Sequence, residues 1–464
     1  MSAVPKSDAV ESLVPLTHQA GVFCATLDVA SVPAAIVDKA RLCIFYGFGI
    51  GVVCLPEVTA AVAAEAAQAL DGAAGTAGAT ALVNGQRLAP SAAAFANAVL
   101  LHARCQEDTS GTAHLGVSIL ASALALIEAG LGRPDRMLEA VIAGYEVGGA
   151  LERLLGQDSM KAGFRASPLY GTIAAAATAA RLLGLPAERI GAALGNAAAF
   201  TGGTLQSIPE GSDEWRYQVG VATRNGLQAA LLARAGSQST RYGLEGAQGL
   251  ARSFARRAFE PAELELGTHW NLPAVTFKPY PVCAHNQTPA ALGVALSARL
   301  QPEQISSLCI RINPYVVPGM LERGPFTRVA ETLMSTYFCV ASALVHGSVT
   351  MTSLAAYGDP AIAGLIARTR VELDAALPFP SAAADVVTQS GERFTLTEMR
   401  RFQDYSLTRD EVQKQLGRLA AESAIPAGCM DALESFAYGL PSGDAQPVLQ
   451  AFEHARAALR HRDG

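Results

Sequence analysis

From about residue 32 to residue 252 the chain repeats one pattern, in which alanine- and leucine-rich blocks carry a polar residue at every third or fourth position. Short turns containing Gly, Pro or Asp separate the blocks, and this spacing is typical of amphipathic helices. Clear examples are Val117–Ala129, Arg136–Leu155, Tyr170–Leu185 and Gln218–Ala235. Pro186 marks a helix start in its first turn. Because small side chains let helices approach closely, the pattern predicts a tightly packed helical domain.

The pattern changes after Trp270. Alternating apolar and polar residues predict four strands, at Ser307–Asn313, Arg370–Asp374, Ala384–Val387 and Arg393–Leu396. A hairpin turn at Gly391 joins the last two strands. Helical segments follow the helix period at Pro289–Leu300, Glu331–Val345 and Asp410–Ser423. The predicted fold is mainly α, with a large all-helical domain (1–272, completed by 401–464) and a smaller α+β domain (273–400).

The size and charge of the chain narrow the classes of partner. A length of 464 residues exceeds that of a single hydrophobic core, which agrees with two domains. With 50% apolar and only 16% charged residues, we expect large surfaces buried inside the protein or between subunits. A net charge of −6 and the lack of a Lys/Arg-rich run argue against nucleic acid as a partner.

Neither a membrane anchor nor a metal site is expected. The apolar run Leu42–Leu55 is shorter than the ~20 residues that a bilayer requires. Residues Met1–Val14 have no apolar core and do not resemble a secretory signal, so we expect a cytoplasmic protein. The eight cysteines include no CxxC pair, which makes zinc binding unexpected. Only Cys105 and Cys283 have polar neighbours.

The segment His102–His114 concentrates reactive side chains between two apolar, alanine-rich segments. It holds two histidines, a thiol, two carboxylates and several hydroxyls. Titratable groups that lie against apolar helices acquire shifted pKa values, which acid–base chemistry requires. The alternative is a helix C-terminus followed by a solvated turn and an N-cap.

Five sequence motifs, in order along the chain, resemble those of the MmgE/PrpD family. They are Phe95–His102, Gly144–Val147, Gly163–Gly171, Glu214–Gly220 and Phe277–Cys283. The family includes 2-methylcitrate dehydratase, cis-aconitate decarboxylase and iminodisuccinate epimerase. The resemblance implies a homodimer of helical and α+β lid domains, with no metal or organic cofactor. It also implies an active site in the cleft between the domains, acting on small di- or tricarboxylates by elimination, decarboxylation or epimerisation.

The family loop is matched by His102, Asp108, Thr109 and His114, while Glu107 replaces one aspartate and Cys105 another. Other positions change chemistry. Arg165 stands where the family has a histidine, Trp215 where it has a lysine with Arg216 as the nearby cation, and Cys283 where some members have a histidine. Lys278 is kept. A family tyrosine falls on Phe338, beside Tyr337.

Removing a proton or CO₂ beside a carboxylate builds negative charge, so the site needs cations and an acid or base with a pKa near neutrality. The residues predicted to be catalytic are His114, Lys278, Asp108, Cys105 and Tyr337. Those predicted to bind substrate are Arg165, Arg216, Thr109, Trp215, Cys283, Tyr170 and His102. The competing interpretations are capping, surface salt bridges and core packing.

The resulting hypothesis is a cofactor-independent lyase acting on a small carboxylate. One alternative is an isomerase or epimerase in which Cys105 and Cys283 exchange an α-proton from opposite faces. Another is a biosynthetic enzyme for a non-citrate substrate, with Trp215 and Phe338 lining an apolar pocket. A third is a non-catalytic protein that binds a small acid. Convergence of Arg165, Arg216, Lys278 and His114 on one small volume would favour an active site.

Overall fold

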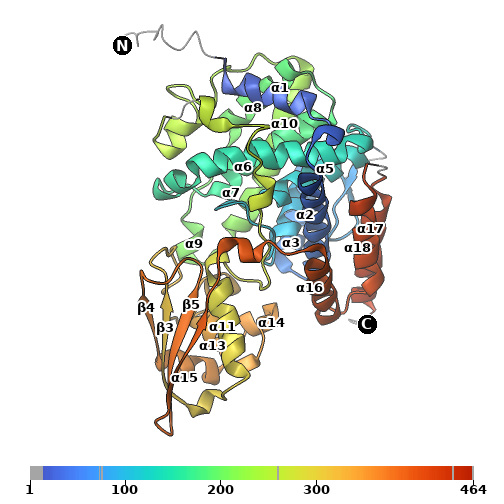
Figure 1. Cartoon of the computed structure of the whole chain (residues 1–464). Helices are drawn as coiled ribbons and strands as arrows, with labels where there is room; N and C mark the ends of the chain where they lie inside the picture. Colours follow the sequence, from blue (N-terminus) through green and yellow to red (C-terminus); the bar gives the residue numbers. More distant parts are fainter. Residues whose placement is uncertain (1–13, 73, 75–76, 259–260, 442–443, 462–464) are drawn as a thin grey trace.

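The computed structural model describes residues 14–72, 74, 77–258, 261–441 and 444–461, and it is mainly α with one small sheet (Figure 1). The segment expected to lack a secretory signal, Met1–Val14, lies outside these residues except for Val14. The amino-terminal helices are α1 (Leu16–Thr26), α2 (Ala34–Val53), α3 (Val58–Asp71), α4 (Pro90–His102), α5 (Gly116–Glu128), α6 (Met137–Lys161), α7 (Ala166–Leu182), α8 (Ala187–Phe200), α9 (Ser207–Glu210) and α10 (Glu214–Ala235).

Helix α7 lies at the centre of the helical domain, between α6 and α10, and every one of its residues is buried. Glycines on the neighbouring helices permit this close packing. A Cβ atom on Gly226 of α10 would lie 2.5 Å from the Ala175 side chain, and one on Gly144 of α6 would lie 2.2 Å from Thr178 Oγ1. The alanine-rich composition thus acts through helix contacts that larger side chains would prevent.

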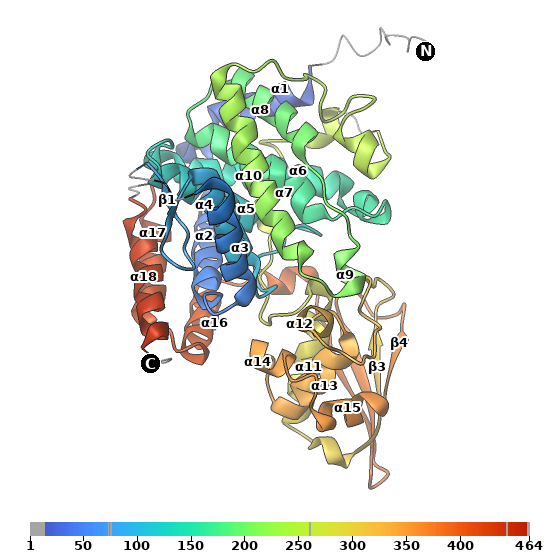
Figure 2. The same ribbon diagram turned by 180° about the vertical axis from the view of Figure 1, so that it is seen from behind.

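The carboxyl-terminal helices α16 (Arg409–Glu422), α17 (Ala427–Gly439) and α18 (Gln446–Arg460) return to the helical domain and lie beside α2 (Figure 2). Their apolar side chains, including Leu416 and Phe452, belong to the same buried cluster as those of α2. A two-stranded ladder of β1 (Ala79–Thr80) and β2 (Arg87–Leu88) interrupts the helices. Pro186 precedes α8 as its N-cap instead of lying in its first turn.

The smaller α+β domain (273–400) is called the lid below. It contains a four-stranded sheet with strand order β4-β3-β5-β6, formed by β3 (Ile305–Ile312), β4 (Thr369–Leu373), β5 (Ala382–Thr388) and β6 (Arg393–Glu398). Strands β3 and β4 are parallel, and the other pairs are antiparallel. Each strand lies within two residues of its predicted limits. Gly391 turns the β5–β6 hairpin with a positive φ of 86°.

Helices α11 (Gln287–Ser297) and α13 (Thr336–His346) pack on each other and cover one face of the sheet. The shorter helices of the lid are α12 (Val329–Thr332), α14 (Met351–Leu354) and α15 (Pro360–Ala367). The single helix predicted at Glu331–Val345 is two helices, because the Ser335 hydroxyl accepts a hydrogen bond from Phe338 N at 3.1 Å and starts α13. A second buried cluster, distinct from that of the helical domain, forms the core here and includes Cys105 and Trp215.

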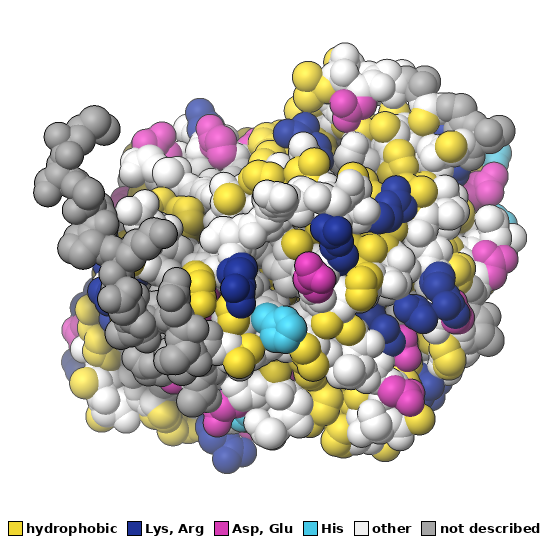
Figure 3. All heavy atoms as spheres, turned by 90° about the horizontal axis from the view of Figure 1, so that it is seen from above, with side chains coloured by type: hydrophobic (Ala, Val, Ile, Leu, Met, Phe, Trp, Pro, Cys, Tyr) yellow, Lys and Arg dark blue, Asp and Glu magenta, His cyan; other side chains and the backbone are white. Residues whose placement is uncertain are grey.

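Figure 3 shows the end of the helical domain that lies away from the lid. On its described part, Lys and Arg side chains are scattered among acidic and apolar ones. Within the part of the chain that the structure describes, no single helix is long and apolar enough to cross a membrane. Helices α2 and α3, bent by 93° at their junction, meet that test only as a pair.

Candidate active site

A cavity of about 110 Å³ lies where the helical domain meets the lid. The helical domain contributes the loop after α4, the start of α7, α9 and the start of α10. The segment 278–285 and two lid turns complete the wall. The lining residues are Cys105, Thr109, Gly111, Thr112, His114, Met160, Arg165, Ala166, Ser167, Leu205, Ile208, Trp215, Lys278, Cys283, Ala284, His285, Val317, Pro318, Leu333 and Met334.

The loop between α4 and α5 is anchored by hydrogen bonds to α6 and to the segment around Thr276. Thr109 and Thr276 exchange backbone hydrogen bonds of 2.8 and 2.9 Å. At the loop tip, Gly111 has a left-handed φ of 58°, and a Cβ there would contact the Glu152 carboxylate, so glycine avoids both backbone strain and a shift of Glu152. The Glu152 carboxylate accepts hydrogen bonds from the Thr112 amide and hydroxyl, both at 2.7 Å.

Glu107 is the buried anion at the centre of the loop. Its Oε1 lies 2.7 Å from Lys278 Nζ and 3.3 Å from His114 Nδ1, and its Oε2 lies 3.0 Å from His102 Nδ1. Burial alone would raise the pKa of Glu107, but His102, Lys278 and His114 together hold it well below its ordinary value. The sequence predicts no role for Glu107, although its place in the matched acidic loop was a usable signal.

Lys278 is the cation held by this carboxylate. Its ammonium also donates to the Cys105 carbonyl at 2.9 Å, and the side chain is only 2% exposed. Burial would lower the pKa of Lys278, but the Glu107 carboxylate, which also accepts a hydrogen bond from its ammonium, keeps it above its ordinary value. The lysine is therefore charged at neutral pH and lines the cavity.

The contacts of the two histidines fix their tautomers. His102 Nε2 lies 2.7 Å from Arg165 Nη2, and because arginine only donates, the His102 proton lies on Nδ1. Burial lowers the pKa of His102 to about 4. His114 Nδ1 lies 3.0 Å from the Asp108 carbonyl oxygen, which only accepts, so His114 Nε2 carries the lone pair. Burial and the nearby Lys278 ammonium lower the pKa of His114 well below its ordinary value.

Arg165, just before α7, is the second cation of the cavity. Its guanidinium donates to the Trp215 carbonyl and to His102. Burial lowers the pKa of Arg165 to about 10, which leaves it protonated at neutral pH. Its planar donor set suits a carboxylate. The Trp215 indole also lines the cavity, and its ring centroid lies 4.8 Å from that of His102.

Arg216 does not line this cavity, contrary to its predicted role as a clamp. It lies over the Trp215 ring, 4.0 Å from the centroid, and donates to Asp213 at 2.6 Å and to the Ala103 carbonyl at 3.0 Å. Arg216 therefore supports Trp215 and the end of α4. Its position on the helix, one residue from Trp215, directs it away from the cavity.

Asp108 also points away from the cavity. Its carboxylate accepts a hydrogen bond from Tyr145 at 2.8 Å, and burial raises its pKa to about 6. Its backbone carbonyl, and not its side chain, contacts His114. His102 lies behind the cavity wall, between Glu107 and Arg165. The sequence placed both residues in the site, and the structure places them behind the lining.

Three aromatic residues lie elsewhere. Tyr337 accepts a hydrogen bond from Val371 N at 3.1 Å inside the lid, and Tyr170 donates to Ser159 at 3.1 Å inside the helical domain. Phe338 packs edge-on against Phe326, with centroids 5.4 Å apart. Their helices direct these side chains into the domain cores. The predictions that Tyr337, Tyr170 and Phe338 face the substrate are therefore not supported by their positions.

Both predicted thiols line the cavity. Burial raises the pKa of Cys105 to about 12 and also raises that of Cys283, so both are neutral at pH 7. The structure adds Ser167 and His285, which the sequence reasoning missed. Ser167 belongs to the Gly163–Gly171 motif and accepts the His114 amide at 3.2 Å. His285 lies two residues after the Phe277–Cys283 motif, and burial lowers its pKa to about 4.

Two buried cations and a neutral histidine whose lone pair lies on Nε2 thus converge on one small cavity between two domains. Such an arrangement is an acid–base site suited to a small anion. The chain belongs to the MmgE/PrpD family, since the MmgE/PrpD N-terminal domain matches residues 19–262 and the MmgE/PrpD C-terminal domain matches residues 280–423.

Curated relatives carry the name of one reaction. A cis-aconitate decarboxylase of Aspergillus terreus is 31% identical over 216 residues, which are 43% of this chain and 44% of the relative. The cis-aconitate decarboxylase-like protein oryM of Aspergillus oryzae is 33% identical over 161 residues, 32% of this chain and 33% of the relative. The human cis-aconitate decarboxylase is 29% identical over 222 residues, 46% and 45% of the two chains. The matches span less than half the length of these relatives.

Proposed function

We propose that the chain is a lyase that decarboxylates a small unsaturated polycarboxylate, with cis-aconitate as the first substrate to test. The observation that carries this proposal is the convergence of Lys278, Arg165 and His114 on one cavity. The named activity of the relatives supports the same reaction class. Arg216, the fourth residue expected at this cavity, is paired with Asp213 instead.

Lys278 and Arg165 would bind the carboxylates of the substrate. Arg165 presents a planar donor set for bidentate contact, whereas Lys278 acts as a compact charge. Glu107 fixes both Lys278 and His114 at distances of 2.7 and 3.3 Å and cannot itself reach the substrate from behind the lining. Arg165 is held by the Trp215 carbonyl and by His102, so both cations would meet the substrate in a preorganised geometry.

The substrate has a carboxylate on the carbon next to its double bond, so that the double bond is β,γ to this carboxylate. In the proposed reaction the bond between that carbon and the carboxylate breaks, and CO₂ departs. The electron pair of that bond forms a new double bond, while the original double bond shifts its electrons to the carbon beside a second carboxylate. That carboxylate, held by a cation, stabilises the charge. His114 Nε2 then delivers one proton to this carbon, and solvent replaces the proton.

His114 must gain a proton before it can act as the acid. In the free protein, burial and the Lys278 charge oppose protonation. A bound polycarboxylate offsets the Lys278 charge, so the pKa of His114 rises when substrate binds. Titration calorimetry with the saturated analogue tricarballylate, in two buffers of different ionisation enthalpy at pH 7, should show net proton uptake. Uptake should be lost in His114→Gln, and equal uptake in that variant would contradict this role.

The activity test uses purified full chain with cis-aconitate and 2-methylcitrate, and measures CO₂ release and the deuterium incorporated from D₂O. His114→Ala should lower kcat by about 10²- to 10⁴-fold. The matched control is His269→Ala, which removes an exposed histidine and should leave kcat unchanged. Equal kcat for His114→Ala and the unmodified protein would overturn the catalytic role of His114.

A less charged substrate is the second candidate, because much of the cavity wall is apolar. Apolar side chains line it together with the cations, namely those of Leu205, Ile208, Val317, Leu333 and Met334. An alkyl-substituted unsaturated acid would use this surface. A higher kcat/KM for such an analogue than for cis-aconitate would select this candidate. Binding of every acid without turnover would select the non-catalytic alternative.

The isomerase alternative requires a thiolate at Cys105 or Cys283. The raised pKa of each thiol gives that step little support. Exchange of a substrate α-proton with D₂O, without CO₂ release and abolished in Cys105→Ser, would nevertheless establish it.

A homodimer, which the family resemblance implies, stays a prediction. One place to test it is α3, whose outward face exposes Val58 (74%), Val62 (46%) and Leu70 (74%). Light scattering should show a dimer that Val62→Glu weakens, and an unchanged dimer would place the interface elsewhere.

A further inference from the structure

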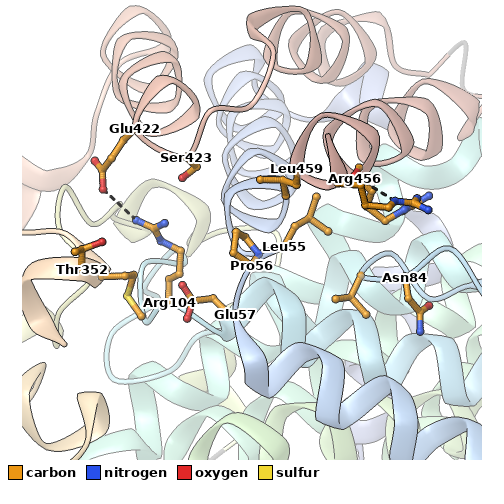
Figure 4. A pocket seen from close by; sticks show the side chains of 13 residues that line it. Leu55, Pro56, Glu57, Asn84, Arg104, Thr352, Glu422, Ser423, Arg456 and Leu459 are labelled. Carbon is orange, nitrogen blue, oxygen red and sulfur yellow. Dashed lines mark hydrogen bonds and ion pairs between the residues drawn. The ribbon is translucent and has the colours of Figure 1, made fainter. Parts of the chain in front are cut away.

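A larger groove, of about 820 Å³, lies between the end of α2, the carboxyl-terminal helices and the lid. Three arginines and an apolar floor define it, and we call it the arginine groove. Figure 4 shows Arg104 at one end and Arg456 at the other, with Leu55, Pro56 and Leu459 between them. Arg460 and the lid residues Met351 and Thr352 also line it.

Arg104 is a buried cation whose hydrogen-bonding capacity is largely unused. It is 4% exposed, and within the described part of the chain its Nε and Nη2 atoms have no hydrogen-bond partner. Nη1 reaches the Val53 carbonyl only at 3.4 Å, and Nη2 lies 3.9 Å from Glu422 Oε1. Such a group is costly to bury, and an oxyanion would supply the missing acceptors.

The other end of the arginine groove offers a second set of donors. Arg456 donates from Nη1 to the Leu82 carbonyl at 2.6 Å, and its buried Nε has no partner among the described residues. Exposed Arg460 lies beside it, with its Nε 3.4 Å from the Arg456 carbonyl oxygen. The two ends, separated by apolar residues, suit a ligand that carries an anionic group at each end.

Two carboxyl groups oppose this charge, at Glu57 and Glu422. Burial raises the pKa of Glu57, while Arg104 and Arg216 act in the opposite direction. Glu422 is 30% exposed and too far from Arg104 for a hydrogen bond, so a ligand oxyanion can replace it at little cost.

We propose that the arginine groove binds a small polyvalent oxyanion, carboxylate or phosphate, with one anionic group on Arg104 and another on Arg456 and Arg460. We expect the same ligand to shift the active-site loop, because Arg104 immediately precedes Cys105 in the sequence. Cys105 has a left-handed φ of 55°, lines the catalytic cavity, and its carbonyl accepts from Lys278 at 2.9 Å. A ligand that moves Arg104 therefore displaces an acceptor of Lys278.

The binding test measures tricarballylate stoichiometry by titration calorimetry on the full chain, which does not depend on turnover. The unmodified protein should bind two equivalents, one in the catalytic cavity and one in the arginine groove. Arg456→Gln/Arg460→Gln should weaken the second equivalent by about 10- to 100-fold and leave the first. The matched control Arg234→Gln removes an exposed arginine at the end of α10 and should bind two. One equivalent in the unmodified protein, or two undiminished in the double variant, would overturn the proposal.

Competition with inorganic phosphate identifies the ligand class. Displacement of the groove equivalent by phosphate assigns a phosphate-bearing ligand, and retention of that equivalent assigns a carboxylate.

Coupling between the arginine groove and the catalytic cavity is measured by the fluorescence emission of Trp215. The measurement uses a Trp270→Phe background, which leaves Trp215 as the only tryptophan. Its emission should change in two phases during the tricarballylate titration. The groove phase should disappear in Arg104→Lys, which keeps the charge but loses the planar fork. A groove phase that survives in Arg104→Lys would contradict coupling through Arg104.

Discussion

Lys278 and Arg104 are two buried cations close to Cys105, but their surroundings differ. Lys278 lies 2.7 Å from Glu107, a carboxylate that is 1% exposed. The nearest carboxylate oxygen paired with Arg104 is 3.9 Å away, on Glu422, which is 30% exposed. A buried charge with a close, buried partner is a fixed part of the protein, whereas one with a distant, solvated partner is available to a ligand.

Among the variants that test this difference between the two cations, Lys278→Met should have the largest effect on the free energy of unfolding. Removing the ammonium strands the Glu107 carboxylate in the interior, so the free energy of unfolding should fall by about 3–5 kcal/mol. Urea denaturation followed by circular dichroism measures it. The double variant Lys278→Met/Glu107→Gln removes both charges and should recover part of the loss. A loss below about 1 kcal/mol in the single variant would show that Glu107 is not dependent on Lys278.

The pH dependence of stability provides the next largest effect. Burial raises the pKa of Asp108 from 3.8 to about 6, so between these values the folded protein binds more protons at this site than the unfolded chain. The Asp108 contribution therefore stabilises the fold below about pH 4 and is lost as pH rises through 6, by about 3 kcal/mol. Asp108→Asn, which keeps an acceptor for Tyr145, should gain stability over the unmodified protein by that amount across the same window.

His102 provides a control of opposite sign. Burial lowers its pKa from 6.5 to about 4, so the unfolded chain binds more protons there between these values. Its contribution is therefore present above about pH 6.5 and is lost as pH falls through 4. Between about pH 4 and 6, His102→Gln should remove a contribution to stability that rises with pH, while Asp108→Asn should remove one that falls with pH. Identical changes in both variants would contradict the two assignments.

The sequence predicted the parts of the molecule that follow a simple period or a matched motif. The helices and strands obey periods of 3.6 and 2, and Lys278, Arg165 and His114 lie in segments whose sequence matches the family. Side-chain direction is less predictable, because adjacent residues on a helix differ by about 100°. Trp215 and Arg216 show this, since one lines the cavity and the other lies behind it.

Glu107 shows a different limit. Its role depends on meeting Lys278, 171 residues further along the chain, and on two histidines that bracket it in the loop. No local pattern records a long-range pairing of this kind. Arg104 Nε and Nη2 have no hydrogen-bond partner among the described residues, and this too is visible only once the surrounding carbonyls and carboxylates have been placed.

The smallest expected effect, and the sharpest test of the contrast, comes from Arg104→Met. The methionine retains an apolar stem, and the guanidinium that it removes has few hydrogen bonds to lose. Glu422 stays solvated, so the free energy of unfolding should change by less than about 1 kcal/mol in a buffer free of polyvalent anions. Adding tricarballylate should then stabilise the unmodified protein more than Arg104→Met, because binding to the folded state adds its own free energy. If Arg104→Met instead costs as much as Lys278→Met in anion-free buffer, Arg104 is as firmly paired as the lysine, and the difference between the two cations disappears.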